Sequence, residues 1–298
     1  MRLAEPAAAQ LVTGVKRDIA LLERVAANSG DRVTVLDVSL ERNRAPLLGL
    51  LERGVRVLYF DHHFAGEIPS HAGLEAHIDT APGTCSSMLV DRYLGGRFRR
   101  WAVAAAFGDG LDQAALELGA TIALGPAETE KLRELGRSLN YNAYGETEAD
   151  LLVPPARLYR ELAHYDDPLQ FVAASDLYGR LNEGRHADLD AALELTAHWS
   201  GRNGDVYVLP EAPWSRRVSG TFANTLVRQH PRRAAAVLSP AGRGYVVSVR
   251  VPAGMRVSAD EFCRSFAGGG GRKEAAGIDH LPPADLEPFL RRFAGAFD

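Results

Sequence analysis

The feature that most constrains the fold is a short apolar run at residues 55–60 (VRVLYF) that is followed directly by Asp61, His62 and His63. Its length and its Val, Leu and aromatic content predict a strand buried in a parallel sheet. The three polar residues then lie at the carboxyl end of that strand, where open α/β sheets bind their ligands. A carboxylate and two imidazoles at this place favour metal or phosphate chemistry. The alternative is a capping Asp with two surface histidines at the exit of a strand.

Two further apolar runs also end in an acid. Residues 33–36 form a stretch rich in β-branched residues that leads into Asp37, and residues 101–107 stop at a Gly-Asp-Gly sequence centred on Asp109. Glycine lets the backbone turn there and leaves the carboxylate projecting from the end of the element. A buried carboxylate is costly unless it is paired or bound to a cation. We therefore expect a divalent metal site built from Asp37, Asp61, His62, His63 and Asp109.

A third motif lies near the C-terminus, where four consecutive glycines at 268–271 precede Arg272 and Lys273. Bare backbone amides beside two cations are typical of an anion-binding loop. The alternative is a flexible surface turn. Upstream, residues 244–251 alternate like a strand and place Ser248 and Arg250 on one face. Arg250 could then bind the same anion through its bidentate guanidinium.

The order and spacing of these motifs resemble those of the DHH phosphoesterase family. The resemblance covers nearly the whole chain, and it rests on an Asp at a strand end (Asp37), the triplet at 61–63, a Gly-Asp element (Asp109) and a Ser-x-Arg strand before the glycine run. It implies a DHH domain followed by a DHH-associated C-terminal domain. It also implies hydrolysis of phosphodiesters, phosphomonoesters or phosphoanhydrides with two divalent cations, usually Mn²⁺, with Mg²⁺ as the alternative.

The resemblance further implies a role for each matching residue. Asp37 would bridge the two metals, while His62 and Asp109 would complete the shell of one of them. His63 would face the substrate phosphate, and Asp61 would orient the neighbouring imidazole, so these two are the expected catalytic residues. The residues expected to bind the rest of the substrate are Ser248, Arg250, Gly269, Gly270, Gly271 and Arg272.

One motif of the family has no counterpart in this sequence. The family's first motif is a strand that ends in Asp-x-Asp, and no aspartate precedes Asp18. We therefore expect one complete metal site and an incomplete second one. Either the sequence starts at an internal methionine of a longer hydrolase, which we favour because the sheet otherwise loses a strand, or the protein binds a phosphate ligand with weak or absent catalysis. Arg272 also stands where many relatives carry a histidine, so proton transfer from that position is not expected.

The chain is longer than one hydrophobic core usually supports, so two domains are expected. Up to about residue 120, predicted strands alternate with helices, which indicates an α/β domain with a doubly wound, mainly parallel sheet. Residues 128–197 have a helical pattern and would cap that sheet. We expect a DHH-like metal-binding domain at 1–197 and a smaller, mixed α/β, substrate-binding domain at 205–298. The pattern also predicts a strand at 10–15, a helix at 19–28 and a helix N-cap at Thr84.

Composition narrows the class of protein. Residues 201–298 carry 14 Lys and Arg against 9 Asp and Glu, although the whole chain has a net charge of −4. A basic C-terminal half and an acidic metal-binding half suit a phosphate substrate. No apolar run approaches roughly 18 residues, and there is no signal-peptide pattern, so we expect a cytoplasmic protein without membrane contact. Cys85 and Cys263 are too few for a disulfide framework or a Cys-ligated zinc site.

These observations lead to one expected function and two alternatives. We expect a Mn²⁺-dependent phosphoesterase that hydrolyses a short oligonucleotide or a small nucleotide phosphoester in a cleft between the two domains. The first alternative is a nucleotide- or phosphate-binding module whose catalysis is impaired because the first metal-binding motif is missing. The second is a general nucleic-acid-binding protein that uses the basic half alone. A homodimer is compatible with all three.

Overall fold

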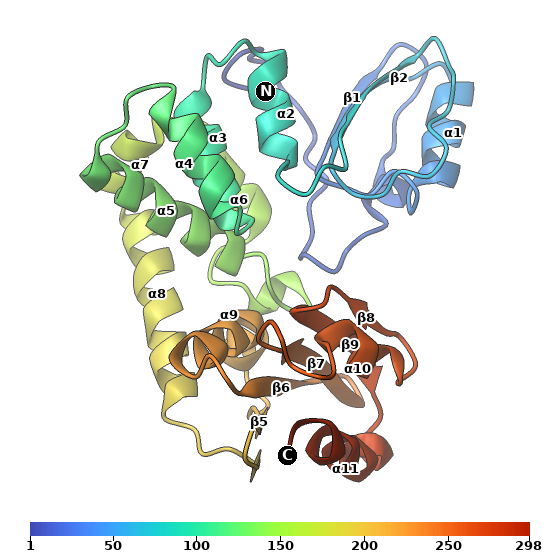
Figure 1. The fold of residues 1–298 in the computed structure, drawn as a ribbon. Coiled ribbons are helices and arrows are strands. Elements are labelled where there is room, and N and C mark those ends of the chain that lie inside the picture. Colours follow the sequence, from blue (N-terminus) through green and yellow to red (C-terminus); the bar gives the residue numbers. More distant parts are fainter. The chain divides into compact units, whose positions relative to one another are not determined.

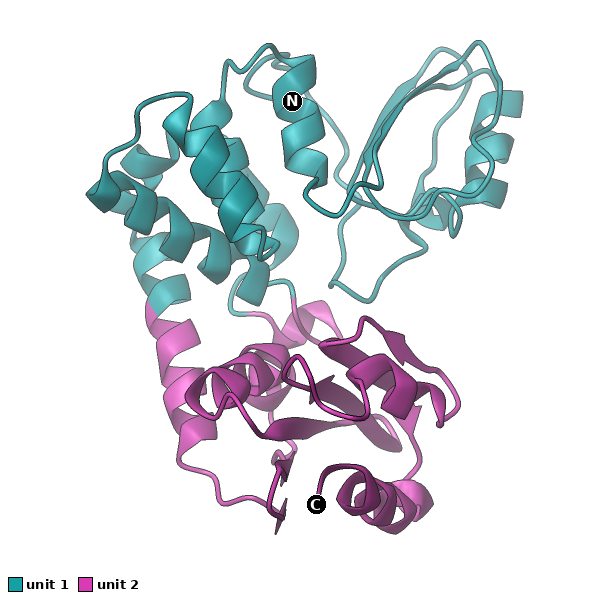
Figure 2. Ribbon diagram, in the orientation of Figure 1, with its two compact units in different colours: residues 1–143, 152–182 teal, residues 144–151, 183–298 magenta.

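The computed structural model describes residues 1–298, which form the helices and strands labelled in Figure 1. They divide into two compact units, shown in Figure 2. The N-terminal unit comprises residues 1–143 and 152–182, and the C-terminal unit comprises residues 144–151 and 183–298. The division after residue 182 falls inside one long helix, α8 (Asp176–Leu193). The functional domain limits expected from the sequence, 1–197 and 205–298, stay a prediction.

The sheet of the N-terminal unit contains β1 (Arg32–Leu36), β2 (Arg56–Asp61) and β3 (Leu74–Ile78), in the order β1-β2-β3. Both strand pairs are parallel, with Leu36 opposite Phe60 and Asp61 opposite Ile78. The carboxyl ends of the three strands therefore lie along one edge of the sheet. The connection from β1 to β2 contains α1 (Arg44–Glu52), which packs over one face of the sheet (Figure 1).

The central strand β2 is buried on both faces, as its apolar run predicts. Val57 and Tyr59 pack with Leu47 and other residues of α1 on one side. Leu58 and Phe60 pack with residues of α2 (Ser86–Tyr93) on the other. The parallel α/β architecture predicted from the sequence is confirmed, and it delivers residues 61–63 to the carboxyl edge of the sheet.

A helical layer completes the N-terminal unit. Its helices are α3 (Arg99–Gly108), α4 (Asp112–Ala120), α5 (Pro126–Tyr141), α6 (Pro155–Leu162), α7 (Pro168–Ala174) and the first part of α8. Helices α3 and α5 pack with their backbones in contact, because a Cβ atom at Gly136 would overlap the carbonyl oxygen of Ala104. Only glycine permits this approach, and it fixes the end of α3 that carries Asp109.

The C-terminal unit has a six-stranded mixed sheet in the order β4-β5-β6-β7-β9-β8. Only the β5/β6 pair is parallel. The strands are β4 (Trp199–Ser200), β5 (Gly204–Val208), β6 (Ala234–Ala241), β7 (Gly244–Arg250), β8 (Gly269–Gly271) and β9 (Ala275–Leu281). Its helices are α9 (Pro213–Gln229), α10 (Ala259–Arg264) and α11 (Leu286–Phe297). A phenylalanine cluster from α10 and α11 packs on the sheet to form the core. The second, mixed α/β part of the prediction is confirmed.

Two local predictions in the N-terminal segment are wrong. Residues 10–15 form no strand, and within 19–28 only Leu21–Arg24 is helical, as a single 3₁₀ turn. Side chains satisfy the backbone groups of this segment in place of a ladder or an α-helix. The side chain of Asn43 accepts a hydrogen bond from the Leu22 amide and donates one to the Ile19 carbonyl oxygen.

Thr84 is not the N-cap of α2. Cys85 occupies the N-cap position without a capping hydrogen bond from its side chain, and the hydroxyl of Thr84 donates to Oδ2 of Asp79 at 3.2 Å. Three short 3₁₀ helices (Leu21–Arg24, Glu148–Asp150 and Pro283–Asp285) connect longer elements. None of the helices combines the length and the apolar composition that a membrane span needs.

Candidate metal centre

Asp37 follows the end of β1 in a left-handed backbone conformation, with a φ of 60° that is uncommon for residues other than glycine. Its amide donates to the carbonyl oxygen of Phe60 at 3.0 Å, which holds the turn against β2. The turn leaves the carboxylate half exposed, and its Oδ1 accepts a hydrogen bond from the hydroxyl of Ser86 at 2.7 Å. Strain of this kind is common where a residue serves a binding site.

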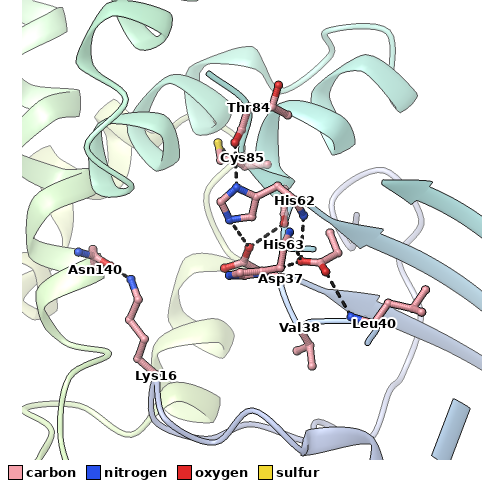
Figure 3. A network of polar contacts seen from close by, with 12 residues as sticks. Lys16, Asp37, Val38, Leu40, His62, His63, Thr84, Cys85 and Asn140 are labelled. Carbon is pink, nitrogen blue, oxygen red and sulfur yellow. Dashed lines mark hydrogen bonds and ion pairs between the residues drawn. The ribbon is translucent and has the colours of Figure 1, made fainter. Parts of the chain in front are cut away.

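His62 faces Asp37 across the edge of the sheet (Figure 3). Its Nδ1 lies 2.8 Å from the carbonyl oxygen of Thr84. A carbonyl oxygen can only accept, so Nδ1 carries the proton and the lone pair of the neutral ring is on Nε2. That Nε2 lies 3.4 Å from Oδ1 of Asp37. A backbone carbonyl that fixes the tautomer in this way is the usual partner of a metal-binding histidine.

Asp61 is fully buried and supports the two histidines that follow it. Its Oδ1 accepts hydrogen bonds from the amides of His62 at 2.8 Å and His63 at 3.2 Å, and from Nδ1 of His63 at 2.6 Å. Its Oδ2 accepts from the amide of Leu40 at 3.3 Å. The hydrogen bond that His63 donates to Asp61 raises the pKa of His63 above its ordinary value, although burial of the ring opposes the shift. Nε2 of His63 is left to face a ligand.

Asp109 caps the C-terminus of α3. The pKa of its carboxyl is raised, because desolvation and the negative charge of Asp37 both disfavour the ionised form. Lys16, His62 and His63 act in the opposite direction and lower the pKa of Asp109. Two carboxylates that repel one another beside two imidazoles form a centre that a cation stabilises.

The donor atoms of this centre fit a divalent cation. One ligand atom each from Asp37, His62 and His63 lies within 4.8 Å of the others, and Asp109 interacts electrostatically with all three. Imidazole nitrogens suit transition metals such as Zn²⁺ or Fe²⁺, and carboxylate oxygens suit Mn²⁺ or Mg²⁺, so the mixed set suits a divalent metal. The structure therefore brings together the five residues that the sequence predicts for the N-terminal site, with Asp61 behind the histidines.

Comparison with solved structures decides the fold. Exonuclease RecJ bound to manganese matches with a TM-score of 0.53 at 20% identity, over 89% of this chain and 74% of that chain. RecJ from Thermus thermophilus with Mn²⁺ matches with a TM-score of 0.56 at 23% identity, over 89% of this chain and 44% of that one. The same protein with Mg²⁺ matches with a TM-score of 0.56 at 19% identity, over 99% and 54%. This chain has the RecJ fold.

RecJ is a DHH-family protein, so the DHH fold expected from the motifs is confirmed. The chain spans about half the length of the Thermus RecJ chains that it matches. No family model matches the sequence, and no curated protein matches it by sequence.

Within this DHH fold, the C-terminal unit carries the residues predicted to bind the substrate. Ser248 and Arg250 lie two residues apart on β7 and thus on one face of the sheet. The guanidinium of Arg250 donates through Nε to Oδ1 of Asn224 at 2.6 Å. Burial lowers the pKa of Arg250, Tyr144 opposes the shift, and the positive charge of Arg272 adds to it. Two guanidiniums that repel one another in this way favour a bound anion.

The glycine run of this DHH fold is a strand and not a loop. Gly269–Gly271 forms β8, which pairs with β9 at the edge of the sheet. The amide of Gly269 donates to the carbonyl oxygen of Phe266 at 3.1 Å, and a Cβ atom there would overlap the carbonyl oxygen of Cys263. Close packing against α10 therefore explains why position 269 needs a glycine. Substrate binding by Ser248, Arg250, Gly269, Gly270, Gly271 and Arg272 stays a prediction.

Three residues of the centre were missed by the sequence analysis. Ser86 donates to Asp37, and the Thr84 carbonyl fixes the tautomer of His62. Lys16 lies close enough to influence Asp109, and its Nζ donates to Oδ1 of Asn140 at 2.9 Å (Figure 3). The only sequence feature that points to Ser86 is the pair of serines at the start of α2. Lys16 carries no such signal, because only the tertiary fold brings it to the site.

Proposed function

We propose that this protein is a metal-dependent phosphoesterase that acts on a short oligonucleotide or a small nucleotide phosphoester. The observation that carries the proposal is the separation of 3.4 Å between Nε2 of His62 and Oδ1 of Asp37, with Nδ1 of His62 engaged by Thr84. Nε2 of His62 and Oδ1 of Asp37 each offer a lone pair, and a cation bound between them would coordinate both atoms. The RecJ structures, solved with Mn²⁺ or Mg²⁺, make these the first metals to test.

The proposed ligands of the cation are Asp37, His62 and Asp109. Asp37 is supported by Ser86 and His62 by Thr84, so both ligands are oriented before a metal arrives. When bound, the cation would supply Lewis-acid polarisation of the phosphoryl group and a lower pKa for an attacking water. The Asp109 carboxyl, whose pKa is raised without a metal, would ionise more readily once the cation offsets the charge of Asp37.

His63 is the proposed partner of the substrate phosphate. Its Nδ1 is hydrogen-bonded to the buried Asp61, so the ring is held in one orientation with Nε2 outward. A proton on Nε2 would donate to a phosphate oxygen, and the charge of Asp61 would stabilise the imidazolium that carries it. Asp61 therefore acts through His63. In the C-terminal unit, Arg250 and Arg272 are the proposed ligands of a substrate phosphate.

The experiment that tests this function is an assay of mononucleotide release from a short labelled oligonucleotide, with the purified chain, in Mn²⁺ and after chelation. We expect turnover in Mn²⁺, loss of turnover after chelation, and recovery when Mn²⁺ is restored. His63→Gln should lower the rate by about 10²-fold or more while leaving the bound Mn²⁺ unchanged, since general acid catalysis contributes about that much. Turnover that survives both chelation and His63→Gln would contradict the proposal.

A nucleotide- or phosphate-binding module without turnover is the second candidate. The observation that favours it is the size of the donor set, because the proposed ligands Asp37, His62 and Asp109 provide for one cation. Phosphodiester cleavage often uses two cations that hold the attacking and leaving oxygens. Mn²⁺-dependent nucleotide binding with no product release in the assay above would favour this candidate over the hydrolase.

A further inference from the structure

Asp79 follows β3 directly and lies at the edge of the sheet that carries the candidate metal centre. β3 runs parallel to β2, with Ile78 opposite Asp61, and the amide of Asp79 donates to the carbonyl oxygen of Asp61 at 3.3 Å. Asp79 is thus a third acid at the carboxyl end of a strand, in addition to Asp37 and Asp61. Its oxygens are not among the clustered donor atoms of the centre. The carboxylate instead binds the loop that leads to α2.

The carboxylate of Asp79 closes the turn that connects β3 to α2. Its Oδ1 accepts a hydrogen bond from the amide of Ala81 at 3.0 Å, and its Oδ2 accepts one from the hydroxyl of Thr84 at 3.2 Å. The amide of Thr84 donates in turn to the carbonyl oxygen of Ala81 at 3.0 Å. Aspartate side chains that accept from the backbone two residues further on form turns of this kind. Both ends of the turn at 81–84 are thus tied to one carboxylate.

Arg92 contacts the same carboxylate from α2. Its two terminal nitrogens each lie 3.4 Å from Oδ2 of Asp79, and one of them also lies 3.5 Å from the hydroxyl of Thr84. The Arg92 side chain is 57% exposed, so this ion pair contributes little by itself. The shorter hydrogen bonds from Ala81 and Thr84 are therefore the ones that we expect to hold the turn.

Thr84 joins this turn to the metal centre. The residue is buried, its hydroxyl is bound to Asp79, and its carbonyl oxygen lies 2.8 Å from Nδ1 of His62 (Figure 3). A neutral imidazole has two tautomers. Only the tautomer with the proton on Nδ1 donates to this carbonyl and keeps a lone pair on Nε2 for a metal. The position of one carbonyl oxygen therefore decides which nitrogen of His62 can bind a cation.

We propose that Asp79 is a positioning residue of the metal centre, which holds the Thr84 carbonyl against His62 and so selects the metal-binding tautomer. The inference rests on the proposed function in one respect, because it takes His62 as a metal ligand. Asp79 is not itself a proposed ligand and acts through Thr84. Replacing an outer partner of a metal-binding histidine typically lowers metal affinity by about 10- to 100-fold. A residue that only stabilised the turn would alter unfolding and leave the histidine ring unchanged.

The first test reads the tautomer of His62 in the absence of metal. Nitrogen NMR of the histidine rings distinguishes a protonated nitrogen from an unprotonated one, and the signals of His62 are those that disappear in His62→Gln. In chelator at about pH 8, where an ordinary imidazole is neutral, we expect the proton of wild-type His62 on Nδ1. Asp79→Ala should give a mixture of the two tautomers. A pure Nδ1 tautomer in folded Asp79→Ala, or no Nδ1 proton in wild type, would overturn the proposal.

The second test measures Mn²⁺ affinity by calorimetry. We expect Asp79→Ala to bind Mn²⁺ about tenfold more weakly than wild type. Asp79→Asn keeps an oxygen for the Ala81 amide, and its NH₂ group can donate to the Thr84 hydroxyl, so it should bind within about twofold of wild type. Glu75→Gln removes an exposed acid from the same strand and should bind like wild type. Wild-type affinity in Asp79→Ala, or equal losses in Asp79→Ala and Asp79→Asn, would contradict positioning.

The third test breaks the connection at Thr84. Thr84→Val removes the hydroxyl and keeps the carbonyl and the shape of the side chain, so it should weaken Mn²⁺ binding about as much as Asp79→Ala does. The double variant should bind no more weakly than either single variant, because both changes cut the same connection. Urea unfolding checks that each variant is folded. Losses of affinity that add in the double variant would refute the role of Thr84 as the intermediary.

The metal-free measurement separates this role from the proposed function. If wild type binds no Mn²⁺ but Asp79→Ala changes the tautomer of His62, the proposed function fails and the positioning role stands. If Mn²⁺-dependent turnover is found but the tautomer of His62 is the same in wild type and in folded Asp79→Ala, the positioning role fails and the proposed function stands.

Discussion

Oδ1 of Asp61 accepts a hydrogen bond from Nδ1 of His63 at 2.6 Å. The Asp61 side chain is fully buried, while the imidazole of His63 is half exposed. The carboxylate also accepts hydrogen bonds from the backbone amides of His62, His63 and Leu40. Four donors converge on two oxygens, which offsets much of the cost of burying the charge. One side chain thus fixes the turn after β2 and the orientation of the ring that we assign to the substrate phosphate.

Replacing this carboxylate should damage both stability and activity. Asp61→Asn presents NH₂ donors to backbone amides that are themselves donors, so we expect a loss of about 1–3 kcal/mol in the free energy of unfolding. Urea unfolding of the two proteins measures it. His63→Gln is the matched variant, because it leaves the three backbone donors of Asp61 in place and should cost less stability. Equal unfolding midpoints for wild type and Asp61→Asn would contradict this account.

The close contact between α3 and α5 gives a second prediction. Gly136→Ala places a Cβ atom against the Ala104 carbonyl oxygen and the Gly108 amide, so the helices must separate. We expect a loss of about 1–3 kcal/mol in stability and weaker Mn²⁺ binding, since Asp109 follows α3 directly. Gly179→Ala is the control, because nothing lies within 4 Å of the added Cβ in α8. That variant should be neutral or stabilised by roughly 0.5–1 kcal/mol.

The pair formed by Asp205 and Arg233 should make the stability of the C-terminal unit depend on pH. Burial disfavours the charged form of Asp205, but hydrogen bonds from Arg233 and Ser200 outweigh it, and its pKa is lowered. A group whose folded pKa is depressed contributes its full stabilisation above its unfolded pKa, about 3.9, and loses it as the pH falls through the folded value. Asp205→Asn should therefore cost about 2 kcal/mol at pH 7 and much less near pH 2.

Urea unfolding at both pH values, followed by tryptophan fluorescence, to which Trp199 on β4 contributes, measures that difference. A difference between wild type and Asp205→Asn that stays constant from pH 7 to pH 2 would refute the assignment. Glu211→Gln is a suitable control, because it removes an exposed carboxylate from the same unit.

Arg250 and Arg272 should bind anions independently of the metal. Changing Arg272 to Ala should weaken binding of a nucleotide phosphate by about tenfold or more, because a charge-assisted hydrogen bond is lost. The Mn²⁺ content should not change. Arg256→Ala removes an exposed arginine elsewhere in the same unit and provides the control. Unaltered phosphate affinity in Arg272→Ala, measured by calorimetry, would exclude Arg272 from the substrate site.

Much of the site was predictable because its signals are local. The run at 56–60 is buried on both faces, so its composition identifies β2 and places Asp61, His62 and His63 at the strand end. Residues 10–28 were not predictable, since the side chain of Asn43, which lies beyond that segment, satisfies two of its backbone groups. The glycine run was predicted as a loop because sequence alone does not show that α10 packs against the backbone of β8.

The supporting residues of the centre depend on tertiary contacts that no local pattern encodes. Ser86 comes from the first turn of α2, and Lys16 comes from an irregular segment. Such residues emerge only when the fold is known.

The most direct test of a metal site at Asp37 is a calorimetric titration of Mn²⁺ into wild type, Asp37→Asn and Asp31→Asn. Asp37 and Asp31 flank opposite ends of the same strand, β1, so the two variants remove the same charge from different edges of the sheet. We expect Asp37→Asn to lose Mn²⁺ affinity by at least tenfold and Asp31→Asn to bind Mn²⁺ like wild type. Unchanged Mn²⁺ binding in a folded Asp37→Asn, or no binding by the wild-type chain, would contradict this expectation.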